Sequence, residues 1–204
     1  MKNYILIGTG GHATSILDLI TSNGNKVQYF VGFNSDLKNL KGIPIVDISE
    51  IGNLSMDFNF VFGIGDFEIR NKVLEDIKLS NTALIFSPLI HSTAYVSSSA
   101  DIGLGTVIFA NAYVGPNTKI GNFCVLNTAT SIDHDCSVGD QNFLAPGTIL
   151  AGSVTTGEKC FFGMGSLVSN NISIGQSSVV SANSFVNENI PSNSFVTGIP
   201  AKLK

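Results

Sequence analysis

The chain has 204 residues, a net charge of −4 and only 13% charged residues, so it offers no basic surface for nucleic acid. Its length allows one or two domains with a substantial core. The apolar start is interrupted by Gly8–His12, too early for a signal peptide or a membrane span. We therefore expect a cytoplasmic protein without membrane insertion.

The first predicted domain, residues 1–87, alternates strands with helices. Strands are predicted at Tyr4–Ile7, Val27–Phe33, Phe58–Ile64 and Thr82–Phe86. One helix follows the first strand until Asn23-Gly24 stops it, and a second is predicted at Phe67–Leu79. The alternation indicates a small parallel, Rossmann-like α/β sheet. Its ligand site should lie at the carboxyl ends of the strands, beside the glycine-rich turns.

The first glycine-rich turn, Gly8-Thr9-Gly10-Gly11-His12-Ala13, matches a variant of the dinucleotide fingerprint. Glycines let the backbone approach phosphates at a helix N-terminus, and His12 would face a phosphate or a sugar. The acid that closes the second strand in such domains can only be Asp36. The domain is short for NAD, so another nucleotide-bearing ligand is favoured, and a purely structural turn is the alternative.

A second glycine-rich turn, Gly63-Ile64-Gly65-Asp66, leads into the helix that carries Arg70. Arg70 could contact a substrate bound at these turns. Alternatively, it is a surface residue or a helix-packing cation paired with Glu68 or Asp66.

The second predicted domain, residues 88–204, follows a six-residue period. In steps of six from Val96 to Val186, every position is apolar except Thr156, and a small residue usually lies two positions earlier. This period fits neither a helix nor one long strand, and hexapeptide repeats are typical of a β-helix of stacked coils. A β-sandwich with coincidental spacing would not hold this phase. We expect the glycines after the apolar column, such as Gly103 and Gly139, to serve turns through unusual backbone angles.

Cysteine and histidine spacing argues against a metal site. Cys124, Cys136 and Cys160 all fall in the small, inward column and lack CxxC spacing, as expected for core residues in a reducing compartment. The three histidines are divided between the two domains and form no H-x₃₋₅-H pair. A zinc site of the γ-carbonic-anhydrase type is therefore not expected.

One turn breaks the small, neutral pattern of the coils. Asp133, His134 and Asp135 follow the inward Ile132, so they should project outward. Imidazole titrates near neutral pH, and an adjacent carboxylate can orient it, which is what a general base requires. A solvated turn is the alternative interpretation.

Four motifs together resemble one family: Gly8–His12, Gly63–Arg70, Asn127–Gly139 and Gly198–Lys202. Across its whole length the chain resembles bacterial sugar acyltransferases of the sialic-acid O-acetyltransferase type. The nearest branch is the N-acetyltransferases of nucleotide-linked 4-amino sugars, as in bacillosamine synthesis. The resemblance implies a left-handed parallel β-helix, a homotrimer and acetyl-CoA as co-substrate between subunits. It also implies a nucleotide-activated amino sugar in the N-terminal domain.

The same resemblance implies roles for individual residues. His134 would take a proton from the sugar amine, and Asp135 would orient it. Ala151 and Gly152 would belong to the acetyl-CoA site, with the Gly152 N–H facing the acetyl carbonyl oxygen, and Lys202 would lie near the CoA phosphates. The nucleotide-sugar positions would be Gly10, Gly11, His12, Asp36, Asp66 and Arg70.

The sequence departs from the family at two places. Relatives often carry a second histidine where this chain has Phe143, and the acids that end the second strand become Asn34-Ser35-Asp36. O-acetylation of sialic acid or a similar sugar is the alternative reaction, because the same histidine could deprotonate a hydroxyl. A non-catalytic binding or scaffold module is the alternative from a different class.

Overall fold

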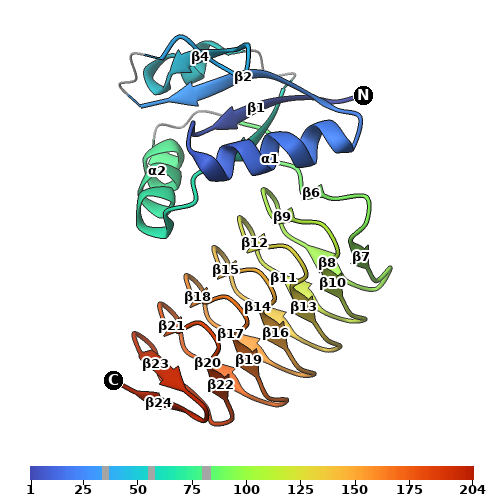
Figure 1. Cartoon of the computed structure of the whole chain (residues 1–204), viewed down its shortest axis with the longest axis vertical. Helices are drawn as coiled ribbons and strands as arrows, with labels where there is room; N and C mark the ends of the chain where they lie inside the picture. The colour runs from blue at the N-terminus through green and yellow to red at the C-terminus, as the bar shows by residue number, and fades with distance from the viewer. Residues whose placement is uncertain (34–36, 55–57, 80–83) are drawn as a thin grey trace. The chain divides into compact units, whose positions relative to one another are not determined.

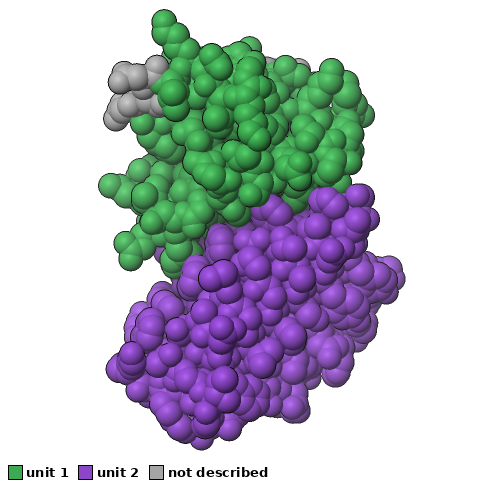
Figure 2. Space-filling model, in the orientation of Figure 1, with its two compact units in different colours: residues 1–89 green, residues 90–204 purple. Residues whose placement is uncertain are grey.

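A computed structural model describes residues 1–33, 37–54, 58–79 and 84–204 of the chain. It contains two compact units, Met1–Leu89 and Ile90–Lys204, which are coloured separately in Figure 2. Within the described ranges, no helix combines the length and the apolar character that crossing a bilayer requires.

The first unit is built on a five-stranded sheet of order β3-β4-β2-β1-β5 (Figure 1). β1 pairs in parallel with β2 and β5, β2 pairs in parallel with β4, and only β3 is antiparallel. The bounds are β1 (Asn3–Ile7), β2 (Lys26–Gly32), β3 (Asn39–Leu40), β4 (Ile43–Asp47) and β5 (Asn59–Phe62). The predicted parallel α/β sheet is therefore confirmed.

Two features of this sheet differ from the sequence prediction. β4 and the short 3₁₀ helix η1 (Ile48–Asn53) were not predicted, although Ile43, Ile45 and Val46 form an apolar run. Of the strand predicted at Thr82–Phe86, the part before residue 84 lies outside the described residues. Within the described part, Ile85 forms one isolated parallel bridge with Asn59 rather than a ladder.

The helices of this unit begin where two neighbouring strands, β1 and β5, end. α1 (Gly11–Ser22) follows β1, and α2 (Phe67–Leu79) follows β5. Strands β1 and β5 are buried almost throughout, as expected for parallel strands whose two faces are both covered. The carboxyl ends of these strands and the N-termini of both helices consequently meet at one edge of the sheet.

The second unit is a parallel β-helix of three-strand coils (Figure 1). Strands three apart in the chain pair in parallel, so Tyr113 lies opposite Ser131 and residues 18 apart stack. The strands are β6 (Leu89–Ile90), β7 (Tyr95–Val96), β8 (Asp101–Ile102), β9 (Val107–Ile108), β10 (Tyr113–Val114), β11 (Lys119–Ile120), β12 (Val125–Leu126), β13 (Ser131–Ile132), β14 (Ser137–Val138), β15 (Phe143–Leu144), β16 (Ile149–Leu150), β17 (Thr155–Thr156), β18 (Phe161–Phe162), β19 (Leu167–Val168), β20 (Ser173–Ile174), β21 (Val179–Val180) and β22 (Phe185–Val186). β23 (Phe195–Gly198) and β24 (Ala201–Leu203) form a closing antiparallel hairpin.

Both predicted columns fill the interior of the β-helix. Apolar residues such as Ile132 are fully buried, and so are small residues such as Thr118. The Thr118 hydroxyl donates to the Asp133 carbonyl at 2.6 Å and accepts from the Cys136 N–H at 3.2 Å. Small polar residues thus satisfy backbone groups at the coil corners, where an apolar residue would leave them unpaired.

The glycines that follow the apolar column have a different purpose from the one expected. Residues with positive φ lie two positions later, as at Asn117 and Asp135, whereas Gly103 and Gly139 have no left-handed backbone. A Cβ at Gly103 would lie 2.4 Å from the Gly121 carbonyl carbon, and one at Gly139 would lie 2.6 Å from that of Gly157. These glycines are required because stacked coils approach closely, not because of their backbone angles.

Candidate active site

The turn between β13 and β14 presents Asp133, His134 and Asp135 on the outside of the β-helix. The Asp135 N–H donates to the Pro116 carbonyl of the preceding coil, and the His134 carbonyl accepts from the Ser153 N–H of the next, both at 2.9 Å. Asp135 adopts the left-handed conformation, which aspartate tolerates better than most residues. Hydrogen bonds on both sides therefore hold the turn in place.

His134 and Asp135 form a hydrogen-bonded pair, with 2.8 Å between Nδ1 and Oδ2, and each side chain is 52% exposed. The bond to Asp135, together with the charge of Asp133, raises the pKa of His134, and the same bond lowers the pKa of Asp135. With the carboxylate accepting from Nδ1–H, the neutral ring carries its lone pair on Nε2. The pair therefore has the arrangement of an oriented general base.

Asn117 is a member of this site that the sequence analysis missed. Its side-chain amide donates to the other Asp135 carboxylate oxygen at 3.1 Å, and this bond also lowers the pKa of Asp135. The 18-residue offset between the two residues was the available signal, since three hexapeptides make one coil and place the two turns one above the other.

Gly152 lies against the imidazole of His134 from the next coil. A Cβ at this position would lie 2.7 Å from both Cε1 and Nε2 of His134, so any larger residue would force the ring to move from this position. Within the described residues, the Gly152 N–H forms no backbone hydrogen bond. By contrast, the Ala151 N–H donates to the Val168 carbonyl, and the Ala151 carbonyl accepts from the Cys136 thiol.

The surroundings of this turn offer neither a second histidine nor a thiolate nucleophile. Phe143 is 7% exposed and stacks on Phe161 with 5.6 Å between the ring centroids. All three cysteines are free and buried, and burial raises the pKa of the Cys136 and Cys160 thiols. A buried, protonated thiol is a poor nucleophile.

In the first unit, a cavity of about 390 Å³ opens at the carboxyl ends of β1 and β5. Of the residues predicted to bind the nucleotide sugar, Gly10, Gly11, His12 and Asp66 line it. A Cβ at Gly10 or Gly11 would meet no atom within 4 Å, so their small size keeps open the space at the N-terminus of α1. An anion can approach backbone N–H groups there, because α1 has no side-chain cap and no acid in its first turn.

His12 lines this cavity, whereas Arg70, which was also predicted to bind the substrate, is not among its lining residues. Burial, together with the nearby Arg70 charge, lowers the pKa of His12 to about 4. Arg70 itself is 1% exposed, so it is a buried cation beside His12 rather than a surface residue. His12 is consequently neutral at physiological pH, and the fixed positive charge in this region belongs to Arg70.

Of the two acids predicted to bind the nucleotide sugar, Asp66 and Asp36, the structure describes only Asp66. Asp66 caps α2, with its carboxylate accepting from the Ile69 N–H at 2.9 Å, and it also lines the cavity. A carboxylate suits a sugar hydroxyl better than a phosphate, because like charges repel. Asp36 lies outside the described residues, as do its neighbours Asn34 and Ser35.

Lys202 is exposed on β24 and pairs with Glu188 at 3.5 Å. β24 lies four strand positions beyond β15, a strand of the coil that carries His134, which corresponds to about 19 Å at the usual strand spacing. Within a single chain, therefore, Lys202 and His134 do not form one cluster. Among the described residues, no group of three or more histidines, cysteines and acids could hold a metal ion.

These features define a class of protein. A Rossmann-like unit with an open glycine-lined cavity is followed by a hexapeptide β-helix with one oriented histidine on its surface. Residues 3–77 match the family model described as the PglD N-terminal domain. A curated UDP-N-acetylbacillosamine N-acetyltransferase of Bacillus subtilis is 32% identical over 114 residues, a match that covers 53% of this chain and 51% of the relative. The match thus spans about half the length of that relative.

Solved structures extend the similarity to the whole chain. The acetyltransferase domain of PglB from Neisseria gonorrhoeae in complex with acetyl coenzyme A is 28% identical, with a TM-score of 0.91 over 100% of this chain and 99% of that one. PerB from Caulobacter crescentus in complex with CoA and GDP-perosamine is 29% identical, with a TM-score of 0.91 over 100% and 98%. The predicted resemblance to bacillosamine-type sugar N-acetyltransferases is confirmed. So is the fold class, a Rossmann-like unit followed by a left-handed parallel β-helix.

Proposed function

We propose that this chain is an acetyl-CoA-dependent N-acetyltransferase acting on the amino group of a nucleotide-linked 4-amino-6-deoxy sugar. The observation that carries the proposal is the outward His134–Asp135 pair, which is packed against Gly152 and held by hydrogen bonds to both neighbouring coils. Solved relatives whose names specify acetyl coenzyme A or GDP-perosamine support the co-substrate and the substrate class.

In the proposed reaction, the sugar amine attacks the thioester carbonyl directly. His134 Nε2 takes the proton that the amine loses as the new N–C bond forms, while Asp135 holds the ring and stabilises its positive charge. The C–S bond then breaks, and coenzyme A leaves as the thiol after its thiolate takes the proton that His134 received from the amine. The buried, protonated state of the cysteines favours this route over an acetyl-enzyme.

The Gly152 N–H is the proposed donor to the acetyl oxygen, where negative charge develops in the transition state. It adjoins the reactive ring nitrogen and has no backbone partner among the described residues. In the same proposal, Gly10 and Gly11 accommodate the diphosphate and Asp66 accepts from a sugar hydroxyl, in the cavity of the first unit.

The proposed enzyme is a cytoplasmic homotrimer. Three free, buried cysteines suit a reducing compartment. One sheet of the β-helix carries an exposed, largely apolar outward column that includes Tyr95, Tyr113, Ile149 and Leu167, and such a column is typical of a subunit contact. Light scattering on the purified chain tests this assembly, because a monomeric mass would contradict it.

The decisive test is release of free thiol from acetyl-CoA in the presence of UDP-, dTDP- and GDP-linked 4-amino-6-deoxy sugars, with free sialic acid in parallel. Turnover on one nucleotide-linked amine is the expected result. Turnover on sialic acid alone would replace N-acetylation with O-acetylation. Failure to bind CoA at all would favour a non-catalytic module.

A further inference from the structure

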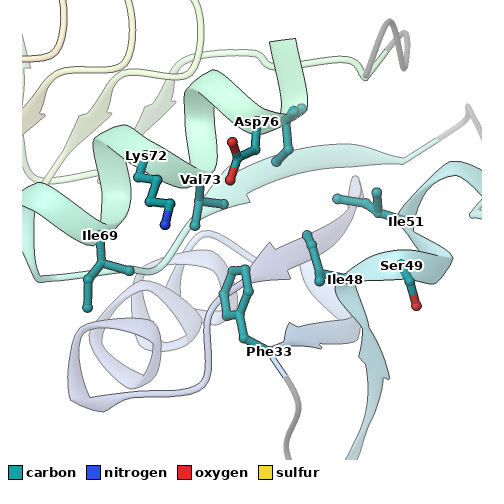
Figure 3. A pocket seen from close by; sticks show the side chains of 9 residues that line it. Phe33, Ile48, Ser49, Ile51, Ile69, Lys72, Val73 and Asp76 are labelled. Carbon is teal, nitrogen blue, oxygen red and sulfur yellow. The ribbon is translucent and has the colours of Figure 1, made fainter. Parts of the chain in front are cut away.

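A second cavity, of about 580 Å³, adjoins the glycine-lined one in the first unit (Figure 3). The two cavities share Phe33 and Ile69 as lining residues. The remaining walls come from η1 and α2, and they consist of Ile48, Ser49, Ile51, Lys72, Val73, Asp76 and Ile77. A ligand whose phosphates lie at Gly10 and Gly11 could therefore extend past Phe33 into this second space.

The lining of this cavity suits a flat, partly polar ring. Most of the walls are apolar, and the Phe33 side chain, 38% exposed, offers an aromatic surface where the two cavities meet. Bases stack on aromatic side chains with little regard to sequence. The polar exceptions are chiefly Lys72 and Asp76, which lie one helical turn apart on α2, across the cavity from Phe33 and Ile48 (Figure 3).

We infer that this cavity holds the base of the nucleotide, and that Asp76 and Lys72 select bases with an imino N–H beside a carbonyl oxygen. Guanine, uracil and thymine have this edge, whereas adenine and cytosine do not. The inference rests on the proposed function, because it takes the ligand of the adjoining cavity to be a nucleotide sugar. Asp76 and Lys72 then determine specificity and take no part in the chemistry.

Hydrogen-bond chemistry gives the reason for this selection. A carboxylate can only accept and an ammonium can only donate, so Asp76 pairs with the imino N–H and Lys72 with the neighbouring carbonyl. Adenine and cytosine present a ring nitrogen acceptor and an amino donor at these positions. Their lone pair would face the carboxylate and their amino group would face the ammonium. With adenine or cytosine bound, Asp76 and Lys72 would be left without hydrogen-bond partners, and this cost makes the discrimination between bases strong.

The test is isothermal titration calorimetry of the full chain with GDP, UDP, dTDP, ADP and CDP. GDP, UDP and dTDP are expected to bind at least about tenfold more tightly than ADP and CDP, the effect of about one charge-assisted hydrogen bond. Asp76→Asn should weaken GDP, UDP and dTDP binding by about tenfold while ADP and CDP keep or gain affinity, because an amide can also donate. Lys72→Met should give a smaller loss for the same three nucleotides.

Asp18→Asn is the matched control, since Asp18 is an exposed acid on α1 that lines neither cavity. Its nucleotide affinities should equal those of the wild type. Equal affinity for all five nucleotides, or an Asp76→Asn variant with unchanged preference, would overturn the base assignment and leave the proposed reaction standing. No binding of any nucleoside diphosphate, with CoA still bound, would overturn the nucleotide-sugar substrate and the base assignment together.

Discussion

The two units place a histidine in opposite environments, and the contrast separates binding from chemistry. His12 lies largely buried near the Arg70 guanidinium, and its pKa falls to about 4. His134 projects from a turn between two carboxylates, and its pKa rises. A neutral, desolvated imidazole suits recognition, whereas an exposed imidazole with an acidic partner suits proton transfer. Burial and neighbouring charge therefore support different proposed roles for the two histidines.

The largest expected effect concerns the exposed member of this comparison. His134→Ala should lower acetyl transfer by about 100- to 10,000-fold, the usual cost of losing a general base. Unfolding temperature and oligomeric mass should stay unchanged, because the side chain is half exposed and its removal leaves no core cavity. His91→Ala is the control, since His91 bonds locally to Thr93. Near-normal turnover in His134→Ala would remove this residue from the mechanism.

The buried histidine, His12, should affect the free energy of unfolding rather than the rate of acetyl transfer. The folded-state pKa of His12, about 4, lies below the unfolded value near 6.5, so between these values the unfolded chain binds more protons. Stability should therefore fall by up to ~3 kcal/mol as pH drops through this window. His12→Gln should remove most of that loss.

Urea unfolding at pH 7.5 and pH 4.5, followed by helical circular dichroism, measures this difference. The signal reports the first unit, because both α-helices of the described residues belong to it. An equal acid-induced loss in wild type and His12→Gln would show that His12 does not carry the effect.

A pair of glycines tests whether the cavity at α1 is built for a ligand. Gly10→Ala should fold normally but bind nucleoside diphosphates about tenfold less tightly, because its methyl group enters space that is otherwise open. Gly8→Ala should instead cost about 1–2 kcal/mol of stability, since Gly8 has φ +117° and a Cβ there would lie 3.0 Å from the Gly63 backbone. Calorimetry and thermal melts on both variants separate the two effects. Unimpaired nucleotide binding by Gly10→Ala would argue for a purely structural turn.

The smallest expected effect concerns Asn117, which donates a hydrogen bond to the carboxylate that holds the proposed base. A base works when neutral, so kcat/KM should rise with pH through the pKa of His134, which lies above 6.5. Asn117→Ala removes one donor from the Asp135 carboxylate, which then stabilises the His134 imidazolium more strongly, so the acid limb should move to higher pH, with a few-fold loss of the plateau rate because Asp135 is held less firmly. Asn117→Gln should restore part of the loss. A slower enzyme with an unshifted limb would indicate a structural role alone.

Repetition explains why the β-helix could be predicted more fully than the first unit. The phase from Val96 to Val186 shows which residues point inward, and the buried columns follow it. The prediction for Gly103 and Gly139 was wrong because these glycines are required by close contacts with the next coil. The local sequence carries no information about those contacts. Asn117 was missed for the same reason, since it meets Asp135 only when two coils stack.

In the first unit, local patterns located β1, α1, β5 and α2 but not β4. The strand β4 contains Pro44, and a proline within an apolar run argues against a strand. In the structure, Pro44 pairs only with the short strand β3. Burial of Arg70 beside His12 could not be read from the chain either, because helical spacing alone leaves it as either a surface or a packing residue.

The 18-residue coil also constrains how such a chain can change length. Inserting or deleting one whole coil beyond Gly152 would leave His134, Asp135, Asn117 and Gly152 in their mutual positions, because these residues depend only on three successive turns. A six-residue change between Asn117 and Asp135 would instead move one of them to a different edge of the prism. Across related chains, insertions in the β-helix should therefore come in multiples of 18 residues, and none should fall between the three turns that carry the proposed site.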